Sequence, residues 1–323
     1  MNSFANLRQQ LRLPVVGSPM FIASGPELVK AQCQAGIVGS FPTLNARPAS
    51  MLTDWLDEIT ESNAAFTAAN PDRPAAPFAV NFIVHRSNNR LEEDLAEVVR
   101  HQVPIVITSL GAREEVNEAV HSYGGVVLHD VINNRFAHKA IEKGADGVIA
   151  VAAGAGGHAG ALSPFALVQE IRTWFDGPLL LSGAIAHGRS ILAALAAGAD
   201  YAYVGSAFLS TTEANVVEDY KQMIVSSAAD DIVYSNYFTG VKGNYLRGSI
   251  TASGLDPENL PESDPTKMDF GNRDKPDSKA WKDIWGSGQG IGVLGATTTT
   301  AELVDNLAAQ FEQAKKELST RMG

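Results

Sequence analysis

Two neighbouring segments in the second half of the chain decide the fold: Leu181-Ser182-Gly183-Ala184-Ile185-Ala186-His187-Gly188 and Ala199-Asp200-Tyr201-Ala202-Tyr203-Val204-Gly205-Ser206-Ala207-Phe208. Each segment contains a short apolar strand that ends in a turn of small residues. Small residues let backbone N–H groups approach an anion closely. The pair therefore predicts two consecutive strand-to-helix turns that bind a phosphate without a lysine; tight turns with no ligand are the alternative explanation of these glycines.

Outward from these segments, apolar runs and helical patterns alternate over the first two thirds of the chain. The runs are rich in Val and Ile, which is typical of strands buried on both faces of a parallel sheet. The expected strands span residues 15–16, 37–40, 78–83, 104–108, 126–128, 147–151, 178–181 and 201–204. The expected helices span residues 26–35, 49–65, 91–101, 114–123, 135–143, 164–175 and 189–197, and an eighth helix is expected to begin near Thr211.

This order of strands and helices is typical of two α/β folds, the (β/α)8 TIM barrel and the doubly wound open sheet. Two observations favour the barrel. The strands number eight, and the glycine-rich segments follow late strands, whereas no GxGxxG motif follows the first strand. We therefore predict an α/β (β/α)8 TIM barrel, with residues 1–323 as a single domain.

The alternating pattern breaks after the eighth strand. Residues 256–283 are rich in Pro, Asp, Lys and Asn and show little apolar periodicity, so we expect a long irregular insertion here. Residues 212–285 are expected to be partly an inserted lid or surface excursion. Residues 300–322 predict an amphipathic C-terminal helix, with its apolar side formed by Leu303, Leu307, Phe311 and Leu318.

Composition limits the class of protein. The 323 residues are 45% hydrophobic and carry a net charge of −11, which is typical of a globular protein and unsuited to nucleic acid or anionic lipid. The single cysteine, Cys33, excludes a disulfide framework and a multi-cysteine zinc site. No apolar run reaches the roughly 18 residues that a membrane span needs, and residues 1–13 do not resemble a secretory signal. We therefore expect a soluble, cytoplasmic protein without nucleic-acid or membrane partners.

The segment Ala153-Gly154-Ala155-Gly156-Gly157-His158-Ala159-Gly160 follows the sixth expected strand and isolates one imidazole. Its small residues expose the backbone to a flat ligand and leave His158 as the reactive side chain. A histidine in this place can act as a general base or donate a hydrogen bond near a cofactor. A flexible loop with an incidental histidine is the alternative, but the end of a barrel strand favours a functional role.

Four further places hold weaker candidates. Gly17-Ser18-Pro19-Met20 ends the first strand, and Asn81 ends the third, where its amide can donate and accept hydrogen bonds. Residues 285–292 place Gln289 among four glycines, which suits either a ligand contact or the hinge of a lid. His129-Asp130 ends the fifth strand. Two ligands without Cys or Glu nearby make a poor metal site, so we expect no metal and retain His129 as a residue facing the site.

Taken together, these segments resemble the flavin-dependent nitronate monooxygenases, formerly called 2-nitropropane dioxygenases. The resemblance covers nearly the whole chain. It rests on Gly17-Ser18-Pro19-Met20, Val80-Asn81, Gly156-Gly157-His158-Ala159-Gly160, Ser182-Gly183-Ala184-Ile185-Ala186-His187-Gly188, Gly198-Ala199-Asp200, Gly205-Ser206-Ala207-Phe208 and Ser287-Gly288-Gln289-Gly290. It implies a TIM barrel that binds FMN non-covalently and uses O2 to oxidise alkyl nitronates, or nitroalkanes, to carbonyl compounds and nitrite.

The resemblance also implies roles for individual residues. The phosphate would lie at the turns of Gly183 and Gly205, Asn81 would bind the polar edge of the flavin ring, and Gln289 would close over it. His158 would be the catalytic residue that meets the substrate. The full set of cofactor-binding residues would be Ser18, Pro19, Met20, Asn81, His129, Gly157, Gly183, Ala184, Gly205, Ser206 and Gln289.

Three departures from relatives put the substrate in doubt. Some relatives have a histidine after the fourth strand, where this chain reads Thr108-Ser109-Leu110-Gly111. Related quinone reductases have a lysine where this chain has Asp130, and Gly183-Ala184 stands where Gly-Gly is common. An NAD(P)H-dependent flavin reductase of quinones or enoyl thioesters, and a barrel that binds a phosphorylated metabolite, therefore remain alternatives. The sequence leaves open the physiological substrate and whether two copies form a homodimer.

Overall fold

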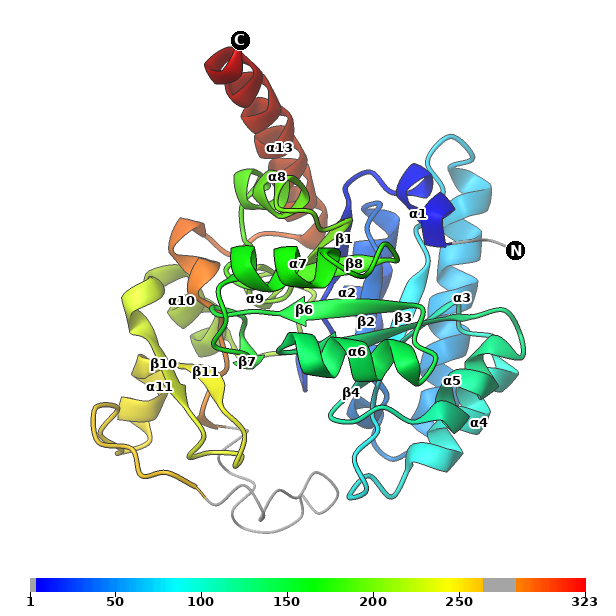
Figure 1. Cartoon of the computed structure of the whole chain (residues 1–323), viewed down its shortest axis with the longest axis horizontal. Helices are drawn as coiled ribbons and strands as arrows, with labels where there is room; N and C mark the ends of the chain where they lie inside the picture. The colour runs from blue at the N-terminus through cyan, green and yellow to red at the C-terminus, as the bar shows by residue number, and fades with distance from the viewer. Residues whose placement is uncertain (1–3, 264–282) are drawn as a thin grey trace.

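The predicted barrel is confirmed. The computed structural model describes residues 4–263 and 283–323, within which eight parallel strands form one sheet surrounded by helices (Figure 1). The sheet order is β1-β9-β8-β6-β5-β4-β3-β2, and a parallel bridge between Val16 and Val38 joins its two edges. The strands are β1 (Val15–Gly17), β2 (Gly39–Pro42), β3 (Phe78–Ile83), β4 (Ile105–Ser109), β5 (Val126–Val131), β6 (Gly147–Val151), β8 (Leu179–Ser182) and β9 (Tyr201–Val204).

Alternate residues along each strand form two separate apolar layers. Val106, Val127 and Val148 belong to a cluster between the strands and the outer helices. Their neighbours Ile107, Leu128 and Ile149 belong to a second cluster that fills the inside of the barrel. This alternation follows from the two-residue period of a strand. It also decides which side chains at the carboxyl ends of the strands face the barrel axis.

Helices cover the outside of the barrel at the expected places. The N-terminal helix α1 (Phe4–Gln10) was not predicted; Leu7 and Leu11 on and after it join the inner apolar cluster. No helix within the described ranges has the length and apolar character to cross a membrane. The helices that alternate with the strands are α2 (Pro26–Gln34), α3 (Met51–Ala69), α4 (Leu91–Arg100), α5 (Glu114–His121), α6 (Asn134–Glu142), α7 (Pro164–Arg172) and α8 (Gly188–Ala196).

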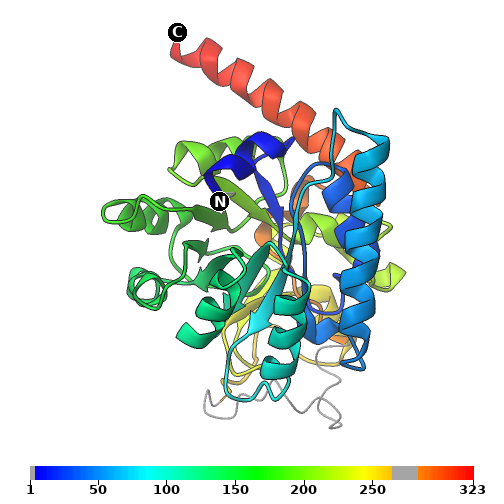
Figure 2. The ribbon, with the colours of Figure 1, turned by 90° about the vertical axis from the view of Figure 1, so that its right-hand side faces the viewer.

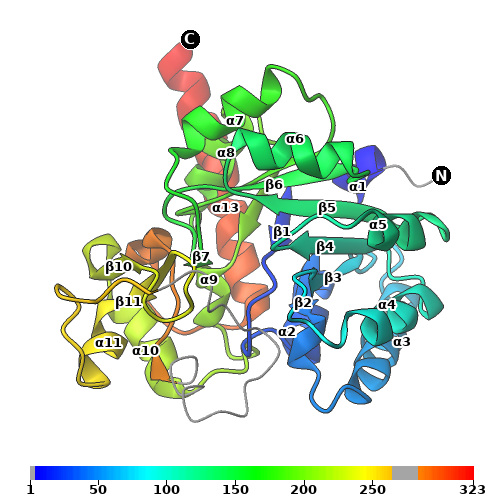
Figure 3. The same cartoon turned by 60° about the horizontal axis from the view of Figure 1, so that its bottom comes forward.

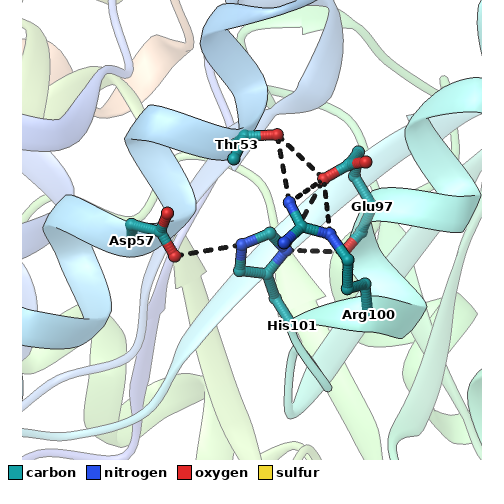
Figure 4. A network of polar contacts seen from close by, with 5 residues as sticks. All are labelled: Thr53, Asp57, Glu97, Arg100 and His101. Carbon is teal, nitrogen blue, oxygen red and sulfur yellow. Dashed lines mark hydrogen bonds and ion pairs between the residues drawn. The ribbon is translucent and has the colours of Figure 1, made fainter.

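Polar side chains tie α3 to α4 on the outer surface (Figure 4). His101 Nε2 lies 3.1 Å from Asp57 Oδ1, and the hydroxyl of Thr53 donates to Glu97 Oε2 at 2.8 Å. Arg100 contacts the same Glu97 carboxylate. These groups are on α3 and α4 or, for His101, directly after α4, so the network serves helix packing rather than the chemistry at the strand ends.

The sequence predicts an eighth barrel helix that begins near Thr211. This prediction is wrong. Thr211 instead forms a bridge with Thr298, which brings the end of a long insertion back to its start. The C-terminal helix α13 (Thr300–Met322) then packs against α8 and α2, and so completes the ring of helices. Figures 1 and 2 show its second half projecting beyond the barrel. Leu318 lies in this half and is 40% exposed, so it is not part of the buried apolar side that the sequence predicted for it.

The insertion contains more regular structure than the sequence predicted. It lies beside the carboxyl ends of the strands (Figure 3). Two of its strands form a small antiparallel sheet with β7 (Gly157–His158), and one of these two pairs with β7 directly. Residues 264–282, most of the expected excursion, lie outside the described residues. A lid role for residues 212–285 stays a prediction. The elements of the insertion and the turn before it are α9 (Ser206–Leu209), α10 (Glu218–Ser226), β10 (Ile232–Ser235), β11 (Gly243–Leu246) and α11 (Arg247–Ala252).

Candidate active site

A cavity of about 670 Å³ lies at the carboxyl ends of the barrel strands, where active sites of this fold are found. Its lining comes from the strand ends, the segment 154–158 and the insertion. Among the described residues that line it there is no lysine or arginine, one carboxylic acid, Asp130, and one imidazole, His158. An anionic ligand would therefore have to be held by backbone and neutral groups.

The structure brings most of the predicted site residues to this cavity. Two predicted residues, His129 and Gln289, are not part of its lining. Those that do line it are Ser18, Pro19, Met20, Asn81, Gly157, His158, Gly183, Ala184, Gly205 and Ser206.

The two decisive turns lie on adjacent strands, because Ser182 of β8 pairs with Tyr203 of β9. Ala184 has a φ of 53°, in the left-handed region that non-glycine residues rarely adopt. A Cβ atom on Gly205 would lie 3.3 Å from Ser18 Cβ, so little room remains for a side chain there. The turns thus present bare backbone to the cavity, as a phosphate group requires.

Some of the glycines in these segments are required by close packing between backbones rather than by a ligand. The N–H groups of Ala184 and Gln289 both donate to the carbonyl of Gly154, at 3.1 and 2.9 Å. A Cβ on Gly156 would lie 2.8 Å from the nitrogen of Gly288, whose N–H donates to Ser206 Oγ at 2.8 Å. Four segments of the chain therefore pack together here, and a side chain on Gly156 would not fit between them.

His158 is fixed by the insertion. It lies on β7 and pairs with Gly243 of β11, and its Nε2 atom is 3.0 Å from Thr239 Oγ1. The hydroxyl of Thr239 donates its single hydrogen to the carbonyl of Val241 at 2.9 Å, so it can only accept from His158. The neutral imidazole then carries its proton on Nε2 and has Nδ1 as its basic nitrogen.

The residues after β1 contribute shape rather than polar contacts. The N–H of Met20 donates to Ser24 Oγ at 2.9 Å, and its carbonyl accepts from Asn45 Nδ2 at 3.0 Å. Both backbone groups of Met20 therefore have partners within the protein, although the residue lines the cavity beside Ser18 and Pro19.

His129 faces the outer helices instead of the cavity, because it follows the inward residue Leu128 on β5. It is buried, and its Nδ1 atom bonds Thr108 Oγ1. Burial, with a smaller effect of Lys139, lowers the pKa of His129 to about 4. Gln289 is exposed at the start of a short 3-10 turn; its Oε1 atom lies beside Gly154, while its neighbours Gly288 and Gly290 line the cavity.

A polar layer on the cavity floor was missed by sequence reasoning. Asn81 Nδ2 donates to Ser109 Oγ at 2.7 Å, and Ser109 Oγ donates to Asp130 Oδ2 at 2.6 Å. Burial raises the pKa of Asp130 to about 6, against a smaller opposite effect of Ser109. The strand period alone predicts that Asp130 faces the cavity, because Asp130 lies two residues after the inward residue Leu128. Within the described residues, no three His, Cys, Asp or Glu side chains gather as metal ligands.

Comparisons with known proteins agree with this architecture. The family model described as nitronate monooxygenase matches residues 6–310. A nitronate monooxygenase of Paraburkholderia phytofirmans is 26% identical, over 94% of each chain. The structure of a nitroalkane oxidase from Streptomyces ansochromogenes has a TM-score of 0.79 and 23% identity, covering 96% of this chain and 99% of that one. The structure of FabK from Thermotoga maritima has a TM-score of 0.74 and 20% identity, covering 98% of each chain.

Proposed function

This chain belongs to the nitronate monooxygenase family of flavin-dependent oxidoreductases, and we propose that it uses FMN and O2 to oxidise alkyl nitronates to carbonyl compounds and nitrite. One observation supports this proposal most strongly. A single cavity joins the bare turns at Gly183 and Gly205, the amide of Asn81 and the imidazole of His158. Bound FMN would supply the redox chemistry, and the protein would supply position and electrostatics.

The residues present fit FMN. Its phosphate would lie at Gly183, Ala184, Gly205 and Ser206, which line the cavity. The N–H of Ala184 already donates to the carbonyl of Gly154, so Ala184 would contact the phosphate without this hydrogen bond. Since no lysine or arginine lines the described part of the cavity, hydrogen bonds from the main chain and the Ser206 hydroxyl would bind the phosphate. Van der Waals surface for a flat ring comes from Pro19, Met20 and the glycines of the segment 154–157.

His158 would bind the substrate beside the ring. A nitronate is already an anion, so the imidazole would orient it and balance its charge. A neutral nitroalkane requires removal of its α-proton as well, and the imidazole of His158 would accept that proton. The strand pairing of β7 with β11 holds the imidazole in place for either task.

Apolar residues around the cavity favour a substrate with an alkyl group. Ile22 and Ile132 line the cavity and are each 42% exposed, and Phe21, Leu110 and Ile284 also line it. These five side chains offer apolar contact to an alkyl group, and none of the five is charged.

Anaerobic mixing of the FMN-loaded protein with two candidate reductants tests the reaction. We expect an alkyl nitronate to bleach the flavin absorbance rapidly and NADH to leave it unchanged on the same timescale. Carbonyl product and nitrite should then appear once O2 is admitted. Rapid bleaching by NADH, without a response to nitronate, would replace this proposal with the NAD(P)H-dependent reductase.

A further inference from the structure

The cavity floor contains the one carboxylic acid among the described lining residues. Asp130 on β5 and Tyr203 on β9 both occupy inward positions of their strands and both line the cavity. Ser109 on β4 and Asn81 on β3 stand beside Asp130 in the same layer. His158 lines the same cavity from β7, which pairs with the insertion strand β11.

The hydrogen bonds of this layer leave Asp130 poorly satisfied. Asn81 Nδ2 donates to the carbonyl of Ile107 at 3.1 Å and to Ser109 Oγ at 2.7 Å. Ser109 then uses its single hydrogen on Asp130 Oδ2. Asp130 Oδ1 is buried without a hydrogen-bond partner among the described residues, and so is the hydroxyl of Tyr203. One hydrogen bond is little compensation for a buried carboxylate.

No described cation offsets the charge of Asp130. Tyr203 interacts with Asp130, His129 precedes it in the chain, and His158 lines the same cavity. Burial raises the pKa of Tyr203, so that its hydroxyl keeps its proton, and His129 is turned toward the helices and neutral. Tyr220, from α10, donates its proton to the carbonyl of Gly286. The β6 residue paired with Asp130 is Ile149, which is apolar.

The charge of a ligand in the cavity must therefore act directly on this carboxyl group. Two charges in a poorly solvated site interact far more strongly than in water. A negative charge above an ionised Asp130 would be strongly unfavourable, whereas a protonated Asp130 removes the repulsion. Burial already raises the pKa of Asp130 to about 6, and repulsion from an anionic ligand would raise that pKa further, through and above neutral pH.

We propose that Asp130 is the proton-exchanging group of this cavity, which takes up a proton when the ligand above it gains negative charge and releases it when that charge leaves. The inference rests on the proposed function, since a flavin reduced by two electrons is an anion. Where an added reductant supplies two electrons and one proton reaches the bound flavin, Asp130 would take one further proton from solvent. It would release that proton on reoxidation by O2.

The midpoint potential of the bound flavin, measured against pH from 6.5 to 8, tests this coupling. Two protons per two electrons give a slope of about 59 mV per pH unit, and one proton gives about 30 mV. We expect the steeper slope in the unmodified protein and the shallower one in Asp130→Asn. The control is Asp305→Asn, whose carboxyl is exposed on α13 and which should keep the steeper slope.

A second readout follows the proton on the carboxyl itself. The infrared difference spectrum between reduced and oxidised protein should show a C=O band of a protonated carboxylic acid, and this band should be missing in Asp130→Asn. A slope near 30 mV in the unmodified protein, equal slopes in both proteins, or no carboxylic acid band would each overturn the inference while FMN remains bound. Failure to bind FMN at all would overturn the proposed function and, with it, this inference.

Discussion

His158 owes its position to the antiparallel pairing of β7 and to Thr239, and none of the contacts described for it makes it part of the phosphate turns. His158→Asn should therefore retain FMN and lose turnover by roughly 10²–10⁴-fold, the usual contribution of a positioned acid–base group. The absorption spectrum of the purified variant and its kcat/KM measure the two effects separately. Loss of the cofactor with this substitution would contradict the assigned role.

Gly205 should show the opposite behaviour. A Cβ atom there would already lie 3.3 Å from Ser18 Cβ, and the two methyl groups of valine would extend into the space assigned to the phosphate. Gly205→Val should yield folded apoprotein, with circular dichroism unchanged and flavin absorbance absent. A variant that still binds stoichiometric FMN would place the phosphate elsewhere.

At the scale of single residues, ten of the twelve residues predicted for the site line the cavity, but of its polar floor the sequence predicted Asn81 and not Ser109 or Asp130. Gly183, Gly205 and His158 stand out because small residues and a lone imidazole mark the ends of strands. Asp130 was read with its neighbour His129 as one pair, although successive residues of a strand point in opposite directions. The contact of Asp130 with Ser109 depends on strand register, which no local pattern records.

At the scale of elements, the packing of α13 on α8 completes the barrel. Gly188, the first residue of α8, touches α13 so closely that a Cβ would lie 2.2 Å from the nitrogen of Phe311. Gly188→Ala must push two helices apart, which should lower the free energy of unfolding by about 1–3 kcal/mol. Urea denaturation measures this change, and Gly295→Ala, with no atom within 4 Å of the added carbon, is the matched control. Equal losses in both variants would refute the packing role of Gly188.

The elements that the sequence did not predict are the short strands of the insertion. β10 and β11 have four residues each, and β11 contains Gly243 and Asn244, which disfavour strands. They form because Gly243 and Asn244 pair with the two residues of β7, a partner more than 80 positions away. The barrel strands, by contrast, are apolar on both faces and were predicted from the sequence within a few residues.

At the scale of the whole molecule, two adjacent groups have opposite effects on stability against pH. The pKa of His129 is 6.5 in the unfolded chain and about 4 in the folded one. The unfolded chain therefore binds this proton first, and His129 destabilises the fold as the pH falls from 6.5 to 4. The pKa of Asp130 is 3.8 in the unfolded chain and about 6 in the folded one. The unfolded chain therefore loses this proton first, and Asp130 destabilises the fold as the pH rises from 3.8 to 6.

Asp130→Asn removes the second effect alone. The variant should be more stable than the unmodified protein at pH 7, by on the order of 2–3 kcal/mol. Most of that gain should disappear at pH 4, which is close to the unfolded pKa of 3.8, so that much of the unfolded chain is protonated at Asp130 as well. Urea denaturation at both pH values provides the comparison. A gain of equal size at pH 4 and pH 7 would show that folding does not raise the pKa of Asp130.

The cofactor itself is the central claim for the whole molecule, since the cavity, the bare turns and His158 all acquire their roles from it. The most direct measurement is the absorption spectrum of the purified protein, followed by denaturation and mass spectrometry of the released chromophore. We predict a yellow protein that releases one FMN per chain without a covalent link. A colourless protein that cannot be reconstituted with FMN would contradict this account.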